Sequence, residues 1–173
     1  MDRMTTLGEI YFSDVARKLA CARDIYAKKG SALLALAGMP ENLTGLERLA
    51  ADLREQMAVM GMFSHCRNCG EKPGGGCCSA FMANETDAVL LLMNLLLGVE
   101  VAPQRDDLFE CRYLGPRGCI FRVKPIFCLN YNCRIILESS DSHHLAALER
   151  AAAAVLQEQT KLENLLLEQI LVR

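Results

Sequence analysis

Cysteine is the residue that most constrains this chain, because eight of its nine cysteines lie between residues 64 and 134. They form two groups, Cys66-x2-Cys69-x7-Cys77-Cys78 and Cys111-x7-Cys119-x8-Cys128-x4-Cys133. So many thiols in one segment can form disulfides, pack as small apolar residues, or bind a metal ion or cluster. The choice among these three depends on the cellular compartment, since stable disulfides are rare in the cytosol.

The sequence contains no segment that is typical of export or membrane insertion. Its N-terminus has an early acid, Asp2, and no uninterrupted apolar stretch, unlike a signal peptide. The longest apolar run, 88–97, is interrupted by Asn94 and has about half of the ~20 residues that a membrane helix needs. We therefore expect a cytoplasmic protein with no membrane association. In that compartment, clustered cysteines favour metal binding or redox chemistry over structural disulfides.

The length and charge of the chain narrow its class further. Its 173 residues suit a single domain, 1–173, with N-terminal helices over 1–63, a cysteine region over 64–134 and a C-terminal helix over 141–173. The formal net charge is −2, so no overall basic field points to nucleic acid. Tryptophan is absent, which disfavours base-stacking surfaces. We expect no nucleic-acid partner.

The first third of the chain has the pattern of two amphipathic helices. Thr6 to Glu9 has the spacing of a capping box, and helical periodicity then runs from Leu7 to Tyr26, with Gly30 as the expected terminator. A second capping box, Thr44 to Glu47, predicts the start of the next helix. That helix has one apolar stripe, formed by Leu46, Leu49, Ala50, Leu53, Met57 and Met60.

Two further helices are predicted, and together they define a mainly α fold. The segment after Asn84, its expected cap, has Asp87 in its first turn, ends at Gly98 and is apolar on nearly all sides, so it is expected to be the buried central helix. A long C-terminal helix begins near Asp141 and would span ~45 Å. Its apolar stripe favours packing along a helical bundle, and the alternative is a homodimer or protein partner that shares this helix. The helices would frame the cysteine-rich, metal-binding loops.

The spacing of the cysteines in the first group is typical of a metal-binding site. A C-x2-C turn directs two sulfur atoms to one metal and exposes backbone N–H groups to the thiolates. The Gly74-Gly75-Gly76 run lets the backbone approach a ligand closely. Adjacent Cys77 and Cys78 direct their side chains differently. Either one of them binds while the other packs, or each serves a different centre.

The second cysteine group is rich in basic residues and contains no Asp or Glu from 111 to 133. Its cations lower thiolate pKa values, or they form a solvated basic loop or a weak patch for an anionic partner. They are Arg112, Arg117, Arg122, Lys124 and Arg134. Zinc and iron–sulfur clusters both take four thiolates, so the metal is left open between zinc and iron. A zinc ribbon would need a second C-x2-C, which this group lacks.

Several residues near the cysteines have separate expected roles. Cys21 lies in the first predicted helix and is expected to pack in the core. His65 is an alternative nitrogen ligand. Pro125 is expected to begin a short helix that carries Cys128, and Cys133 could lie on the same helix. Three apolar residues would shield the site from water, namely Phe121, Ile126 and Phe127.

The order of the cysteines resembles the YkgJ-type cysteine cluster family, whose CxxCxxCC domain is described as zinc- or iron-chelating. The resemblance covers about residues 64–134. The matching residues are Cys66, Cys69, Cys77, Cys78, Cys111, Gly118-Cys119-Ile120, Lys124-Pro125, Cys128 and Cys133. The chain differs from the family in its seven-residue gap before the double cysteine and in having Lys124 where Arg is common. A similar domain in flagellin lysine N-methylases is linked to iron–sulfur-dependent methyl transfer, which adds a cluster to the cofactors that the resemblance implies.

The sequence thus predicts a metal-binding protein that chelates zinc or an iron or iron–sulfur centre through clustered cysteine thiolates. All eight cysteines from Cys66 to Cys133 are candidate ligands, and Cys78 is favoured over Cys77. One alternative is a thiol–disulfide switch at Cys77–Cys78 or at Cys128 and Cys133. The other is a helical interaction module in which zinc only stabilises the loops. No phosphate loop, S-adenosylmethionine loop or Ser-His-Asp set is found, and whether the protein is an enzyme is left open.

Overall fold

The computed structural model describes residues 6–70, 76–105, 109–116, 118–130 and 132–171, and it is 71% helix and 4% strand. These proportions confirm the predicted mainly α fold. In chain order the elements are η1 (Gly8–Phe12), α1 (Val15–Leu34), α2 (Met39–Val59), α3 (Met62–Gly70), α4 (Ala80–Asn84), α5 (Ala88–Leu96), β1 (Leu114–Gly115), β2 (Gly118–Cys119), α6 (Ile126–Asn130), α7 (Arg134–Ser139) and α8 (Ser142–Leu171).

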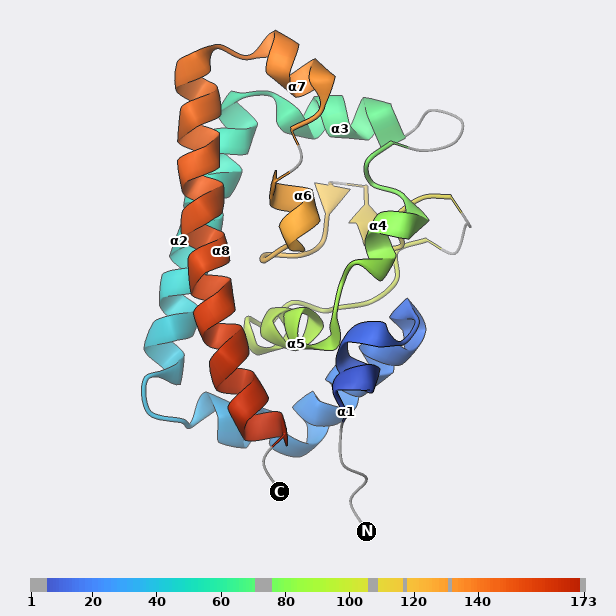
Figure 1. Ribbon diagram of the computed structural model, residues 1–173, viewed down its shortest axis with the longest axis vertical. Helices are drawn as coiled ribbons and strands as arrows, with labels where there is room; N and C mark the ends of the chain where they lie inside the picture. Colours follow the sequence, from blue (N-terminus) through green and yellow to red (C-terminus); the bar gives the residue numbers. More distant parts are fainter. Residues whose placement is uncertain (1–5, 71–75, 106–108, 117, 131, 172–173) are drawn as a thin grey trace.

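The two longest helices, α2 and α8, lie side by side and run in opposite directions along the long axis (Figure 1). At one end of this pair α3 packs against α7, and towards the other end α1 packs against α5. The short elements α6, β1 and β2 lie between these two ends (Figure 1). The elements that carry Cys119 and Cys128, β2 and α6, therefore lie between the two helical ends.

The C-terminal helix agrees with its prediction. It begins directly after Asp141, whose carboxylate accepts a hydrogen bond of 2.8 Å from the His144 N–H. Its apolar stripe is buried along the whole helix, from Leu148 to Ile170, and α8 packs on α2 of the same chain. The bundle interpretation accounts for this stripe, and a homodimer or other partner on α8 stays a prediction. No helix among the described residues has the length and hydropathy needed to cross a membrane.

Helix α5 is the buried centre, as its composition predicts. Eight of its residues are buried, and the left-handed Gly98 (φ 74°) ends it as expected. The predicted cap is wrong, because Asn84 ends α4 and Asp87 caps α5 by accepting a 2.7 Å hydrogen bond from the Leu90 N–H. Asn84 instead presents its carbonyl to the buried Lys18 ammonium at 2.7 Å, which ties α4 to α1.

The predicted first helix is divided in two. The Thr6–Glu9 capping box is present, with the Glu9 N–H donating to the Thr6 hydroxyl at 3.2 Å, but it begins only the π-helical η1. Asp14 then caps a new helix, α1, by accepting from the Arg17 N–H at 2.9 Å. Gly30 does not end α1, which continues to Leu34. A Cβ at Gly30 would lie 3.1 Å from the Tyr26 ring, so this glycine makes room for that ring.

The second helix begins earlier than the Thr44–Glu47 box predicts. Helix α2 starts at Met39, because Gly38 takes the left-handed conformation (φ 81°) that turns the chain and Pro40 fits the first helical turn. The predicted stripe is confirmed. Its members are buried apart from Leu49, which is partly buried and packs against the same core.

One buried polar side chain fixes the segment between β2 and α6. Asn94 on α5 is fully buried, and its amide nitrogen donates to the carbonyls of Leu90 at 3.0 Å and Val123 at 2.9 Å. Its amide oxygen accepts from the N–H groups of Arg122 at 2.9 Å and Val123 at 3.3 Å. The residue that interrupts the apolar run in the sequence therefore anchors the loop that separates Cys119 from Cys128.

Replacing Asn94 with leucine tests this anchor. We expect Asn94→Leu to lower the free energy of unfolding by about 3 kcal/mol, because buried backbone groups at residues 122 and 123 lose their partners. Urea unfolding followed by circular dichroism measures the change. Asn42→Leu, the same substitution at an exposed position of α2, should change stability by no more than about 0.5 kcal/mol. Equal losses in the two variants would contradict the anchoring role.

Candidate metal centre

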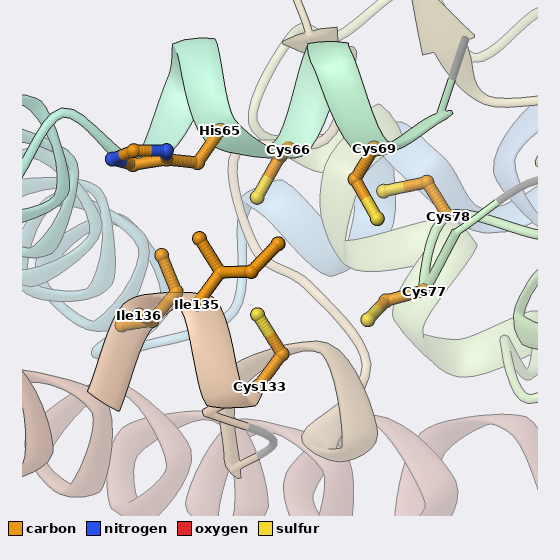
Figure 2. A pocket seen from close by; sticks show the side chains of 8 residues that line it. All are labelled: His65, Cys66, Cys69, Cys77, Cys78, Cys133, Ile135 and Ile136. Atoms are coloured by element: carbon orange, nitrogen blue, oxygen red, sulfur yellow. The ribbon is translucent and has the colours of Figure 1, made fainter. Parts of the chain in front are cut away.

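The first two cysteines lie on a helix. Gly61 (φ 64°) separates α2 from α3, and α3 carries both Cys66 and Cys69. The predicted C-x2-C turn is therefore wrong, since the chain between these cysteines is helical. The spacing serves the same end, because residues three apart lie on one face of a helix. Both sulfur atoms point from α3 into the same space (Figure 2).

The double cysteine approaches this helix through a glycine. A Cβ on Gly76 would lie 2.5 Å from the Cys69 sulfur and 3.1 Å from the Cys69 carbonyl carbon and oxygen. No other residue fits at that position without displacing Cys69, which agrees with the predicted close approach of the glycine run to the cysteines. Gly74 and Gly75, the rest of the run, lie outside the described residues. Gly76 thereby places Cys77 beside α3.

Backbone hydrogen bonds join the two cysteine groups. The carbonyl of Cys78 accepts from the N–H of Cys111 at 2.9 Å, and the Ala80 N–H donates to the Phe109 carbonyl at 2.9 Å. Ser79 and Glu110 form an antiparallel bridge between these bonds. Segments that are distant in the sequence are therefore paired directly at the double cysteine.

The β1–β2 hairpin brings Cys119 back towards Cys111. Leu114 pairs with Cys119 across the two strands, and Gly118 adopts φ 99°. The backbone N–H groups of Tyr113 and Phe121, two residues after each of these cysteines, act to lower the pKa values of the Cys111 and Cys119 thiols. Backbone N–H groups thus act on thiols of the second cysteine group, whereas the sequence predicts such groups at the C-x2-C of the first.

The last two cysteines belong to different helices. Pro125 directly precedes α6, which carries Cys128 as predicted, and the Cys128 N–H donates to the Pro125 carbonyl at 2.9 Å. Cys133 does not lie on α6. It occupies the N-cap position of α7, where its carbonyl accepts from the Leu137 N–H at 3.0 Å.

All eight clustered cysteines line two adjoining cavities. The small cavity has a volume of about 30 Å³, and the cysteines that line it are Cys66, Cys69, Cys77, Cys78 and Cys133. Figure 2 shows this cavity between α3 and the start of α7, with Cys77 entering from the side. The large cavity has a volume of about 380 Å³, and its cysteines are Cys66, Cys78, Cys111, Cys119 and Cys128.

The protein environment makes these thiols hard to ionise without a cation. Burial raises the pKa of Cys78 to about 12 and that of Cys128 to about 12, and neighbouring thiols add to both rises. Burial also raises the pKa of Cys111 to about 11. Cys119 and Cys128 have exposed surface because they face the large cavity, but the surrounding protein still excludes enough water to raise their pKa values.

The basic residues of the second group divide between two roles. Lys124 lines the large cavity, and its charge lowers the pKa values of Cys66, Cys119 and Cys128 against the effect of burial. Arg112 acts in the same direction on Cys111. The other described members bind carboxylates, Arg122 that of Glu47 and Arg134 that of Glu138. Arg117 lies outside the described residues.

The predicted apolar shield is partly wrong. Phe121 is buried and lines the large cavity, as expected. Ile126 and Phe127 are more than half exposed, because the five-residue α6 directs its first turn outward. Two methionines that the sequence did not assign to the site also line the large cavity with apolar surface, namely Met57 and Met82. No local motif marks Met82, since α4 reaches the cavity only through the fold.

The two remaining candidate residues have different surroundings. His65 borders the small cavity, but its ring points away from the sulfur atoms (Figure 2). Cys21 packs against the hydrophobic core from α1 and lines neither cavity, as predicted.

The donor set fits a thiophilic metal. Sulfur donors from separate segments face common cavities, and each cysteine sulfur is directed by a single side-chain torsion with three staggered positions. Among the described residues, no three His, Cys, Asp or Glu side chains already have the spacing of a metal site. Coordination would therefore require cysteine side chains to rotate within the cavities that they line.

Comparison of the chain with protein-family models, with curated proteins and with solved structures finds no match.

Substituting Gly76 tests how closely the double cysteine must approach α3. We expect Gly76→Ala to lower the free energy of unfolding by about 1–3 kcal/mol, because its methyl group would overlap Cys69. Gly45→Ala is the matched control, since a Cβ there meets no atom within 4 Å and alanine favours the helix by about 1 kcal/mol. Chemical unfolding of both variants measures the difference. A neutral or stabilising Gly76→Ala would contradict the close approach.

Proposed function

We propose that this chain is a metal-binding protein that holds zinc or iron, including iron in an iron–sulfur centre, through its clustered cysteine thiolates. The observation that carries the proposal is the gathering of eight thiols around two adjoining cavities. The cysteines come from α3, the segments before α4 and before β1, strand β2, α6 and the start of α7. Several short elements of the fold thus position cysteine sulfur atoms.

The electrostatic environment of these thiols favours a cation as their binding partner. Because burial and neighbouring sulfurs raise the thiol pKa values, ionisation inside the cavities is unfavourable unless a positive charge compensates it. A bound metal displaces the thiol protons and supplies that charge. Thiolates are soft ligands and select zinc or iron–sulfur centres over hard cations such as magnesium. Zinc would supply structural cross-linking, and an iron–sulfur centre would supply one-electron chemistry.

The cavity walls favour metal binding over a disulfide switch. Cys128 lines only the large cavity and Cys133 only the small one, so this predicted exchange pair does not share a cavity. Cys77 and Cys78, the other predicted pair, are adjacent in the chain, but Cys77 lines only the small cavity whereas Cys78 lines both. The arrangement places each thiol among several others, which suits coordination by more than two sulfur atoms.

Elemental analysis of the full chain tests the proposed function. After anaerobic purification we expect stoichiometric zinc or iron. Cys111→Ser should weaken metal binding by at least roughly 10–100-fold, the loss expected even for a residue that only supports a ligand. Cys21→Ser is the control and should retain the metal, since Cys21 lies outside both cavities.

The experiment has a clear contrary outcome. Wild-type protein that is fully folded by circular dichroism and contains neither zinc nor iron, even after exposure to both under anaerobic conditions, would refute the proposal.

A further inference from the structure

The two cavities differ more than tenfold in volume, and this difference determines the size of the metal group that each can hold. A cavity needs roughly 10–15 Å³ to hold one water molecule, so the small cavity, at about 30 Å³, has room for a single ion and not for a larger group. The large cavity, at about 380 Å³, is far wider than the sphere of four sulfur atoms at ~2.3 Å that surrounds one zinc ion. A polynuclear centre is the thiolate-bound group that fits such a space.

Three cysteines are unique to the small cavity, namely Cys69, Cys77 and Cys133. Cys66 completes a set of four with them, because it lies one turn from Cys69 on the same face of α3. Figure 2 shows these four sulfur atoms around one space, with α3 on one side and the start of α7 on the other, together with Cys78, which also lines this cavity.

Three other cysteines are unique to the large cavity, namely Cys111, Cys119 and Cys128. Cys78 completes this second set, since it lines the large cavity and its carbonyl accepts a 2.9 Å hydrogen bond from the Cys111 N–H. Cys66 and Cys78 line both cavities and so lie at the boundary between them. The adjacent cysteines of the double-cysteine motif thus belong to different sets.

The charges around the large cavity suit a centre that carries net negative charge. Four cationic side chains line it, and no Asp or Glu does so among the described residues: Arg54, Arg67, Arg105 and Lys124. Of these, Arg105 is paired with Glu110. Lys124 acts directly on the thiols. No described cation lines the small cavity. The backbone N–H groups that lower the pKa values of Cys111 and Cys119 act on thiols of the large-cavity set. In iron–sulfur proteins, hydrogen bonds to the sulfur atoms adjust the reduction potential of the cluster.

We propose that the eight thiols form two unlike centres. Cys66, Cys69, Cys77 and Cys133 bind one zinc ion in the small cavity, and Cys78, Cys111, Cys119 and Cys128 bind an iron–sulfur cluster in the large cavity. This inference rests on the proposed function and adds to it the number of centres, their nuclearity and their ligands. The zinc centre holds α3 to α7, and the cluster is the redox-active group.

The adjacent pair allows a closely matched experiment on the full-length protein. Wild-type protein, reconstituted anaerobically with zinc, iron and sulfide, is expected to contain zinc together with iron, acid-labile sulfide and visible cluster absorption. Cys77→Ser should lose the zinc and keep the cluster absorption. Cys78→Ser should lose the iron, sulfide and absorption and keep the zinc. Cys133→Ser and Cys128→Ser should repeat these two patterns, and circular dichroism verifies folding.

The outcomes separate this inference from the proposed function. Wild-type protein that binds only one kind of centre would overturn the two-centre assignment and leave metal binding intact, and this result does not depend on any variant folding. Folded Cys77→Ser and Cys78→Ser variants that lose the same metal would also overturn the two-centre assignment. Folded wild-type protein that binds no metal at all would refute the proposed function itself.

Discussion

The Asn94 side chain is the contact on which the cysteine region most depends. It satisfies backbone groups of Arg122 and Val123 from inside the apolar helix α5, where an unpaired polar group would be costly. From the other side, the Gln159 amide on α8 donates to the Lys124 carbonyl at 3.1 Å. The loop between Cys119 and Cys128 is therefore held by two helices at once, and the positions of both cysteines and of Lys124 follow from it.

This anchoring explains how short elements form a defined site. The hairpin and α6 are too short to be stable alone, and helices below about 12 residues are marginal in water. They obtain their positions from the long α2–α8 pair, the central α5 and the backbone bond between Cys78 and Cys111. A bound metal would add cross-links among these same segments. The frame is built by apolar burial, and the site within it by a few buried polar contacts.

The sequence predicted the features that local patterns determine. The long helix after Asp141, the apolar α5 ending at Gly98 and the stripe of α2 follow from periodicity and terminators, and all are present. Helix starts were less predictable, since Asp14 and Gly38 overrode the expected boundaries. The separation of the thiols into two cavities depends on long-range pairing, such as that of Cys78 with Cys111, and no local pattern encodes it. The resemblance to the YkgJ-type family rests on the order of the cysteines and a few residues beside them, and it stays a prediction.

X-ray absorption spectroscopy at the edge of the bound metal tests the central claim most directly, because it reports the atoms that surround the metal. Metal held by the clustered thiolates should show a first shell made of sulfur, with zinc–sulfur distances of about 2.3 Å. A first shell dominated by nitrogen or oxygen, at about 2.0–2.2 Å, would contradict the account. It would place the metal on surface histidines or carboxylates and away from both cavities.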